Sequence, residues 1–260
     1  MPLSNWNCSL HGVVPLDHYS SGDCNLYSSR VINTILAKEQ GDSNHQGFCL
    51  TPTTVLACPR QIVIERFLPY AVSPGDLITM SVGTWAHQAL NRQAVGVSGK
   101  LFGHDFVGEI DAVDGGIIEE DKFTGASSMG WRVKHGPSPD HIAQVSMYAL
   151  LYDGPVDEVA INYYCVGGTK GKPSYMRFVV KPMTEDELLR HKPASGDRTV
   201  KDNLSDLVAA FHHIKNNVDT RAVIKSMPLT GTTMFNGKKC SSYCTVNKLC
   251  LNEIEGRHDW

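Results

Sequence analysis

The chain has 260 residues, of which 42% are hydrophobic and 20% are charged, and its formal net charge at pH 7 is -3. This composition supports one large domain with a real core but gives no global attraction for nucleic acid, so any DNA contact must be local. No run approaches the ~20 consecutive apolar residues of a membrane span, and the N-terminus lacks the basic and apolar regions of a signal peptide. We therefore expect a cytoplasmic protein with no membrane partner.

Two helices are predicted in the first third of the chain. Residues 1–50 are rich in Ser, Asn, Asp and Gly, which predicts a loosely organised N-terminal extension. Thr51 is a suitable N-cap for a helix of about four turns, in which Pro59 indicates a kink or a broken start near Cys58. A second helix is expected over residues 77–93, where the string GTWAHQAL lies.

A β-hairpin is the strongest local pattern. HDFVGEIDAV alternates like a half-buried strand, Asp114-Gly115-Gly116 is typical of a turn, and GIIEEDKFT is the expected partner strand. After a loop that contains Gly and Pro, PDHIAQVSMYALLYD is predicted to be a helix, EVAINYYCVG and SYMRFVVK two strands, and TEDELLRH and NLSDLVAAFHHIKNN two further helices. This order of elements predicts an α/β fold with a mixed central β-sheet flanked by helices.

The hairpin carries charged residues that suit phosphodiester hydrolysis. Asp111 and Glu120 lie on opposite sides of the turn and can converge, and Lys122 must share a face with Glu120 because strand side chains alternate. Carboxylates can hold a divalent ion that activates water, and an ammonium group can neutralise developing charge. The alternative is that EEDK is the acidic end of an exposed strand. Against that reading, an apolar run leads into these charges, which is costly without ions or partners.

Three polar residues on the predicted helices could join this site. A lone helical histidine such as His87 is more often a surface residue than a ligand, but neutral imidazole binds manganese-like ions well. Gln144 and Tyr148 are four residues apart and share one helix face, either as a polar stripe in solvent or as groups near a scissile phosphate.

Taken together, GTWAHQAL, GEIDAV, IIEEDKFTG and the pair Gln144 and Tyr148 resemble the RecB-like branch of the PD-(D/E)XK nuclease superfamily. The resemblance implies a restriction-endonuclease-like core that binds Mg²⁺ or Mn²⁺. It implies metal ligation by His87, Asp111 and Glu120, completed by the backbone carbonyl of Asp121. It also implies a catalytic Lys122, with Gln144 and Tyr148 lining the DNA path.

The eight cysteines are not expected to form disulfides in a reducing compartment. Three close thiols and a distant one suit a four-thiolate site for a [4Fe-4S] cluster or for zinc, and spacing alone does not choose between them. These residues are Cys58, Cys240, Cys244 and Cys250.

One cysteine followed far away by three is similar to the RecB-like nucleases with an iron-sulfur cluster, including the AddB-type and CRISPR-associated exonucleases. That resemblance favours [4Fe-4S], although the family's final run is usually C-x2-C-x5-C and here three residues separate Cys240 from Cys244. The remaining cysteines, Cys8, Cys24, Cys49 and Cys165, show no partner pattern and are expected to be small buried hydrophobes. Cys8 with His11 could suggest a metal, but nothing nearby in the sequence completes a site.

The resulting hypothesis is a metal-dependent DNA exonuclease that acts on single-stranded or frayed ends, with protein partners in CRISPR adaptation or recombination, or a role in viral DNA processing. Its expected parts are an extension over residues 1–50, a nuclease core over 51–225, and a cysteine segment over 226–260 that packs back on the Cys58 helix. The alternatives are a non-catalytic DNA-end-binding or scaffold subunit with the same fold, and a zinc-stapled scaffold without catalysis.

Overall fold

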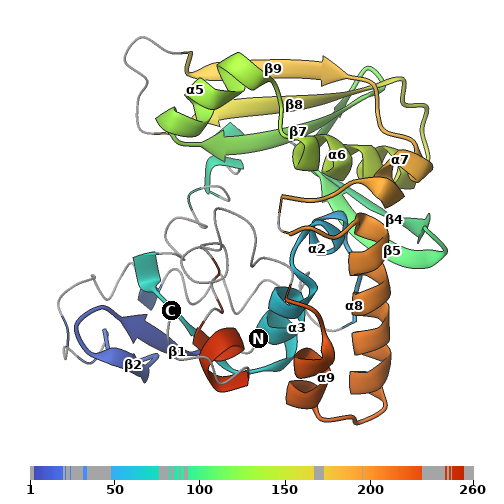
Figure 1. Ribbon diagram of the computed structural model, residues 1–260. Coiled ribbons are helices and arrows are strands. Elements are labelled where there is room, and N and C mark those ends of the chain that lie inside the picture. The colour runs from blue at the N-terminus through green and yellow to red at the C-terminus, as the bar shows by residue number, and fades with distance from the viewer. Residues whose placement is uncertain are drawn as a thin grey trace.

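The computed structural model describes residues 3–19, 21, 24, 32–33, 48–75, 82, 85–87, 89–90, 93–166, 173–194, 196–229, 244, 246 and 248–254. Within these residues the fold is α/β, with three small sheets and helices packed between and beside them (Figure 1). The elements in chain order are β1 (Leu3–Cys8), β2 (Gly12–Pro15), α2 (Pro52–Leu56), α3 (Pro59–Phe67), β3 (Tyr70–Val72), β4 (Val95–Leu101), β5 (His104–Ile110), β6 (Ala112–Asp114), β7 (Ile117–Thr124), α5 (Ala126–His135), α6 (Pro139–Leu151), β8 (Glu158–Cys165), β9 (Tyr175–Val180), α7 (Glu185–Arg190), α8 (Val200–Lys215), α9 (Thr220–Ser226) and the π-helical turn η2 (Lys248–Ile254).

The largest sheet is mixed and has the strand order β6-β7-β8-β9. β7 pairs antiparallel with β6 across the Gly115-Gly116 turn and in parallel with β8, which in turn pairs antiparallel with β9. Both turn glycines have positive φ, +56° and +85°, as a tight hairpin requires. The predicted hairpin is therefore confirmed at its turn.

The first strand of that hairpin is shorter than predicted because it breaks at Asp111. Up to Ile110 the chain pairs with β4 in a separate two-stranded sheet, and from Ala112 it pairs with β7. Asp111 thus lies at the bend between the two sheets. Helix α6 packs against strands of both sheets, so the bend and β7 face a common helix.

The helices before the sheet begin as the sequence indicates. The Thr51 hydroxyl accepts a hydrogen bond from the Thr54 amide in a capping box, and the predicted long helix is divided into α2 and α3 next to Pro59. α2 and α3 pack on α8, and the fully buried Val55, Val63 and Ile64 belong to the main hydrophobic core. No helix among the described residues is long and apolar enough to span a membrane.

The sequence patterns did not predict α5, β4 or α9. α5 lies where a loop was expected, since its Ser127, Ser128 and Gly130 hide the helical pattern, and β4 carries two glycines that weaken its strand pattern. α9 follows α8 directly and was also missed.

The N-terminal segment also differs from the expectation of loosely organised polypeptide. β1 and β2 form an antiparallel hairpin, and β3 adds to β1 in parallel, well away from the β6–β9 sheet (Figure 1). A second hydrophobic cluster lies under this sheet, with Trp6 and Tyr19 almost fully buried.

Candidate active site

Strand β7 presents charged side chains on both of its faces. Its parallel pairing with β8 buries residues 118–121, so Glu119, Glu120 and Asp121 are all less than a tenth exposed. Alternation along the strand directs Glu120 and Lys122 to the face that α6 covers, and Glu119 and Asp121 to the other. Three neighbouring buried carboxylates are costly to ionise unless cations or hydrogen-bond donors compensate them.

On the α6 face, a hydrogen-bonded network joins the strand to the helix. Lys122 Nζ lies 2.5 Å from Glu120 Oε1 and donates to Gln144 Oε1 at 2.9 Å. The Gln144 amide nitrogen donates to Glu120 Oε1 at 2.9 Å and lies 3.4 Å from the Tyr148 hydroxyl. Burial, with repulsion from Glu120, raises the pKa of Tyr148, so this hydroxyl stays protonated and can donate. The structure thus brings Glu120, Lys122, Gln144 and Tyr148 together.

Asp111, at the bend between the two sheets, contacts both β7 and His87. Its Oδ2 accepts a hydrogen bond from the Asp121 backbone amide at 2.8 Å, and its Oδ1 lies 3.4 Å from His87 Nδ1. Burial first, and then repulsion from Glu120, raises the pKa of Asp111 to about 7, although the Asp121 amide and Lys122 oppose the shift. Near neutral pH the Asp111 carboxyl is therefore partly protonated, and a bound cation would displace the proton.

A possible metal-binding group is formed by His87, Asp111 and Asp121, whose ligand atoms lie within 4.8 Å of one another. One imidazole and two carboxylates are a donor set that suits Mg²⁺ or Mn²⁺. The composition of the group differs from the expectation in two respects. The resemblance implied the backbone carbonyl of Asp121, whereas here its carboxylate lies in the group, while Glu120 is engaged by Lys122.

On the opposite face of the sheet, Asn162 holds two of the acidic side chains. Its amide nitrogen donates to Asp121 Oδ1 at 3.0 Å and to Glu119 Oε2 at 3.2 Å, and Arg177 donates to Glu119 Oε1 at 2.6 Å. Asn162 is fully buried, and sequence reasoning missed it. The signal was a single amide inside the apolar strand EVAINYYC, where a polar side chain needs a specific partner.

A row of aromatic side chains extends from the metal-binding group across the face of the sheet that carries Asp121 and Asn162. The His87 and Phe123 rings meet edge to face at 5.0 Å, and Phe123 stacks on Tyr164 at 5.1 Å with an interplanar angle of 19°. Tyr164 in turn lies 5.1 Å from Tyr175, which is 45% exposed. Strand pairing fixes the row, because Phe123, Tyr164 and Tyr175 occupy paired positions on β7, β8 and β9.

The predicted cluster cysteines are described in part, since Cys240 lies outside the described residues. Arg60 of α3, two residues after Cys58, donates to Cys250 Sγ at 3.8 Å and to the backbone oxygen of Met227 at 2.7 Å. Cys244 Sγ lies 3.9 Å from Gln61 Oε1. The C-terminal turn η2 therefore packs against α3, the helix that follows Cys58.

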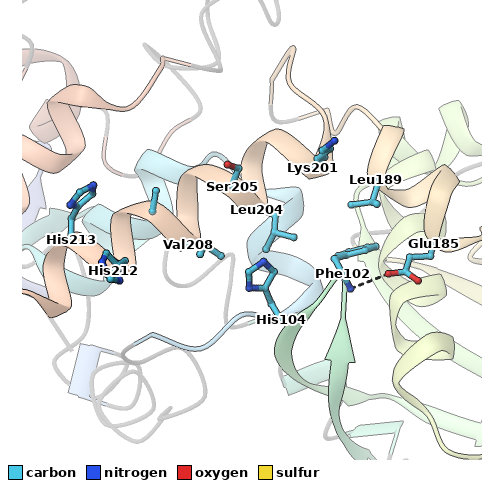
Figure 2. A pocket seen from close by; sticks show the side chains of 11 residues that line it. Phe102, His104, Glu185, Leu189, Lys201, Leu204, Ser205, Val208, His212 and His213 are labelled. Atoms are coloured by element: carbon cyan, nitrogen blue, oxygen red, sulfur yellow. Dashed lines mark hydrogen bonds between the residues drawn. The ribbon is translucent and has the colours of Figure 1, made fainter.

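A cavity of about 730 Å³ lies between α8 and the turn that joins β4 to β5 (Figure 2). Its wall includes Phe102, His104, Glu185, Lys201 and His212. None of the predicted site residues lines this cavity, so it is separate from the carboxylate cluster.

No protein-family model and no curated protein sequence matches the chain. Two solved structures show a likeness. The crystal structure of SSO0001 is 13% identical, with a TM-score of 0.46, over 69% of this chain and 84% of that one. An alkaline exonuclease from Laribacter hongkongensis, LHK-Exo, is 14% identical, with a TM-score of 0.39, over 65% of this chain and 92% of its own. Because both TM-scores are below 0.5, these likenesses do not assign the chain to a family. The function is therefore argued from the chemistry of the site.

Proposed function

We propose that this protein is a divalent-metal-dependent deoxyribonuclease with a PD-(D/E)XK-type site on strand β7. One observation carries the proposal: His87, Asp111 and Asp121 gather within ligand distance at the same stretch of strand that offers Glu120 and Lys122 to α6. A cation site and an ammonium group at one end of a sheet are the two charge-stabilising parts that phosphodiester hydrolysis needs.

The local charge supports a cation. Among the described residues, Asp111, Glu120 and Asp121 supply three carboxylates beside the ammonium group of Lys122. Burial first, and then repulsion from Glu120, raises the pKa of Asp111, and a bound cation would offset both effects. When bound, Mg²⁺ or Mn²⁺ would polarise a phosphoryl oxygen and activate water. His87, Asp111 and Asp121 fit as ligands, and Glu120 lies beside them.

Three side chains of the protein would orient the substrate and neutralise the charge that develops on its phosphate. Gln144 holds both Glu120 and Lys122, which fixes the position of the ammonium group. From there Lys122 would stabilise negative charge that develops on the phosphate. The protonated Tyr148 hydroxyl, 3.4 Å from the Gln144 amide, would donate a hydrogen bond to the substrate or to water.

The row of Phe123, Tyr164 and Tyr175 supports nucleic acid as the substrate. Successive bases of a single strand stack on aromatic side chains regardless of sequence. The row begins at the His87 ring and ends at an exposed tyrosine, so a strand lying on it would place a phosphate near the metal-binding group. Duplex bases are already stacked on one another, so this surface favours single-stranded or frayed ends.

The C-terminal cysteines would serve a structural role. We propose that Cys58, Cys240, Cys244 and Cys250 hold a [4Fe-4S] cluster that fastens the C-terminal segment to α3. The contacts of Arg60 with Cys250 and Met227 support this, since they bring the two segments together. Partners in CRISPR adaptation, recombination or viral DNA processing follow from the same hypothesis.

The test is hydrolysis of end-labelled DNA in Mg²⁺ or Mn²⁺, with linear single-stranded, linear duplex and circular single-stranded substrates. Wild-type protein should degrade linear single strands and spare circles, and EDTA should abolish the reaction. Lys122→Ala and Glu120→Gln should each lower kcat by about 10²-fold or more. Lys100→Ala is the matched control, because Lys100 is a solvent-exposed lysine of β4 whose side chain is 72% exposed.

Two results would contradict the proposal. Wild-type rates in Lys122→Ala and Glu120→Gln, with circular dichroism showing folded protein, would remove the assigned roles. DNA binding without hydrolysis in any divalent ion would favour the non-catalytic end-binding alternative.

A further inference from the structure

A second group of metal-binding side chains lies in the N-terminal sheet. Cys8 ends β1, His11 occupies the turn to β2, His18 follows β2, and Cys24 lies beyond it. Their four ligand atoms all lie within 4.8 Å of one another. In the sequence the spacing is C-x2-H-x6-H-x5-C. The expectation that no nearby residue completes a site with Cys8 and His11 is therefore wrong, because the fold brings His18 and Cys24 beside them.

The distances match the edges of a tetrahedron around one ion. For Zn–S bonds of about 2.3 Å and Zn–N bonds of about 2.05 Å, tetrahedral edges are about 3.8 Å between two sulfurs, 3.6 Å between sulfur and nitrogen, and 3.3 Å between two nitrogens. The corresponding separations here are 4.0 Å from Cys8 Sγ to Cys24 Sγ, 3.5 Å from Cys8 Sγ to His11 Nδ1, and 3.2 Å from His11 Nδ1 to His18 Nε2. Each of these three edges agrees to about 0.2 Å, and the other three separations among the four ligand atoms are within 4.8 Å.

Other uses of the same four residues fit less well. A disulfide would bring the two sulfurs to about 2.05 Å, roughly half of the observed separation. A Rieske-type [2Fe-2S] centre places its cysteines on one iron and its histidines on the other, which keeps sulfur and imidazole nitrogen well apart. The 3.5 Å between Cys8 Sγ and His11 Nδ1 indicates a single ion instead.

The local structure favours a thiolate at Cys8. Cys8 and Gly12 pair across the end of the β1–β2 hairpin, so the turn Ser9–His11 folds back over the sulfur. The Tyr19 side chain and the backbone at Leu10 and His11 form hydrogen bonds with the Cys8 sulfur. Metal-binding cysteines are thiolates, so this environment suits a ligand.

The N-terminal sheet of β1, β2 and β3 also needs a source of stability. Its hydrophobic cluster among the described residues is small, with Trp6, Val14, Tyr19 and Ile32 as its largest members, and it is separate from the main core. Units with so little apolar surface to bury usually depend on a disulfide or a metal.

We propose that Cys8, His11, His18 and Cys24 form a structural Zn²⁺ site that holds the N-terminal hairpin in its folded form. Four protein ligands leave no open position for water or substrate, which is the arrangement of structural rather than catalytic zinc. Softer sulfur and imidazole donors also distinguish it from the carboxylate group on β7, which suits Mg²⁺ or Mn²⁺.

The test is the zinc content of the purified full chain, measured by inductively coupled plasma mass spectrometry after dialysis against metal-free buffer. Cys24→Ser should lower zinc by about one equivalent per chain. Cys165→Ser is the matched control, since Cys165 lies on β8, in another sheet, and should keep it. Asp111→Asn should also keep it, which separates this ion from one bound at the candidate active site.

Substitution of His11 provides a second test of the zinc site. Because the His11 side chain is exposed, its replacement should not disturb the packing of the hydrophobic cluster. His11→Ala should lower zinc affinity at least tenfold, whereas His11→Cys replaces one ligand with another and should retain the ion. With Co²⁺ in place of zinc, His11→Cys should strengthen the sulfur-to-metal charge-transfer absorption. Zinc that is equal in wild type, Cys24→Ser and His11→Ala would overturn the proposal. Loss of zinc in His11→Cys as complete as in His11→Ala would also overturn it.

Discussion

Gly108 of β5 lies against the ring of Tyr148, and we expect Gly108→Ala to disturb the site through this contact. A Cβ at position 108 would lie 2.6 Å from Tyr148 Cε1 and 3.2 Å from Cδ1, well inside ordinary contact distance. The Tyr148 ring is only 6% exposed, so it cannot move aside freely. Overpacking of this kind costs about 1–3 kcal/mol, which corresponds to a fall in Tm of about 2–4 °C for each kcal/mol in a chain of this size.

Gly96→Ala is the matched control, since Gly96 lies on the paired strand β4 and a Cβ there meets nothing within 4 Å. Thermal unfolding followed by circular dichroism would compare the two variants. Gly108→Ala should also lower the proposed nuclease activity, because the added methyl group would move the Tyr148 hydroxyl away from Gln144. Adding Tyr148→Leu should relieve part of the destabilisation. Equal Tm values for Gly108→Ala and Gly96→Ala would refute the reasoning.

Two further predictions concern substrate and pH. Tyr164→Ala should weaken binding of a single-stranded oligonucleotide by about 5-fold to 150-fold, because a base stack is worth about 1–3 kcal/mol, and Tyr164→Phe should keep the wild-type affinity. Fluorescence anisotropy in Ca²⁺ measures this, and equal affinities for Tyr164→Ala and wild type would contradict the proposed stacking surface. Burial, with the charges of Lys122 and Arg132, lowers the pKa of His141 from 6.5 to about 3. The folded state therefore keeps His141 neutral while the unfolded chain binds a proton below pH 6.5, so stability is fully present above that pH and is lost as the pH falls towards 3. Between pH 7 and pH 4.5 wild type should lose about 2–3 kcal/mol more than His141→Gln in urea unfolding, and parallel curves would contradict the assignment.

Much of the fold could be predicted because its signals are local. The Thr51 cap, the Pro59 break and the Gly115-Gly116 turn each depend on a few neighbouring residues, and the structure confirms them. The parity rule also placed Glu120 and Lys122 on one face correctly.

What could not be predicted depends on contacts between distant segments. At Asp111 the chain passes from β5, which pairs with β4, to β6, which pairs with β7, and the two glycines of β4 weaken the strand pattern that would have predicted this partner. The carboxylate of Asp121 lies beside His87 and Asp111 and accepts a hydrogen bond from Asn162 on the neighbouring strand. Periodicity along one segment carries no information about such partners.

The grouping of the N-terminal histidines and cysteines could not be predicted for the same reason. Cys8 and His11 form a recognisable pair, but the second pair lies 7 and 13 residues beyond His11, too far for a local spacing rule. The hairpin of β1 and β2 brings them together, and it was itself hidden in a segment rich in Ser, Asn and Gly.

The central claim is that Asp111 helps to hold a divalent ion beside β7, and Mn²⁺ binding followed by electron paramagnetic resonance tests it most directly. At pH 8, above the raised pKa of Asp111, wild-type protein should bind Mn²⁺, and Asp111→Asn should weaken that binding at least about tenfold. Asp114→Asn, at an exposed position in the nearby turn, should leave it unchanged. Binding of Mn²⁺ by Asp111→Asn with wild-type affinity would contradict the account.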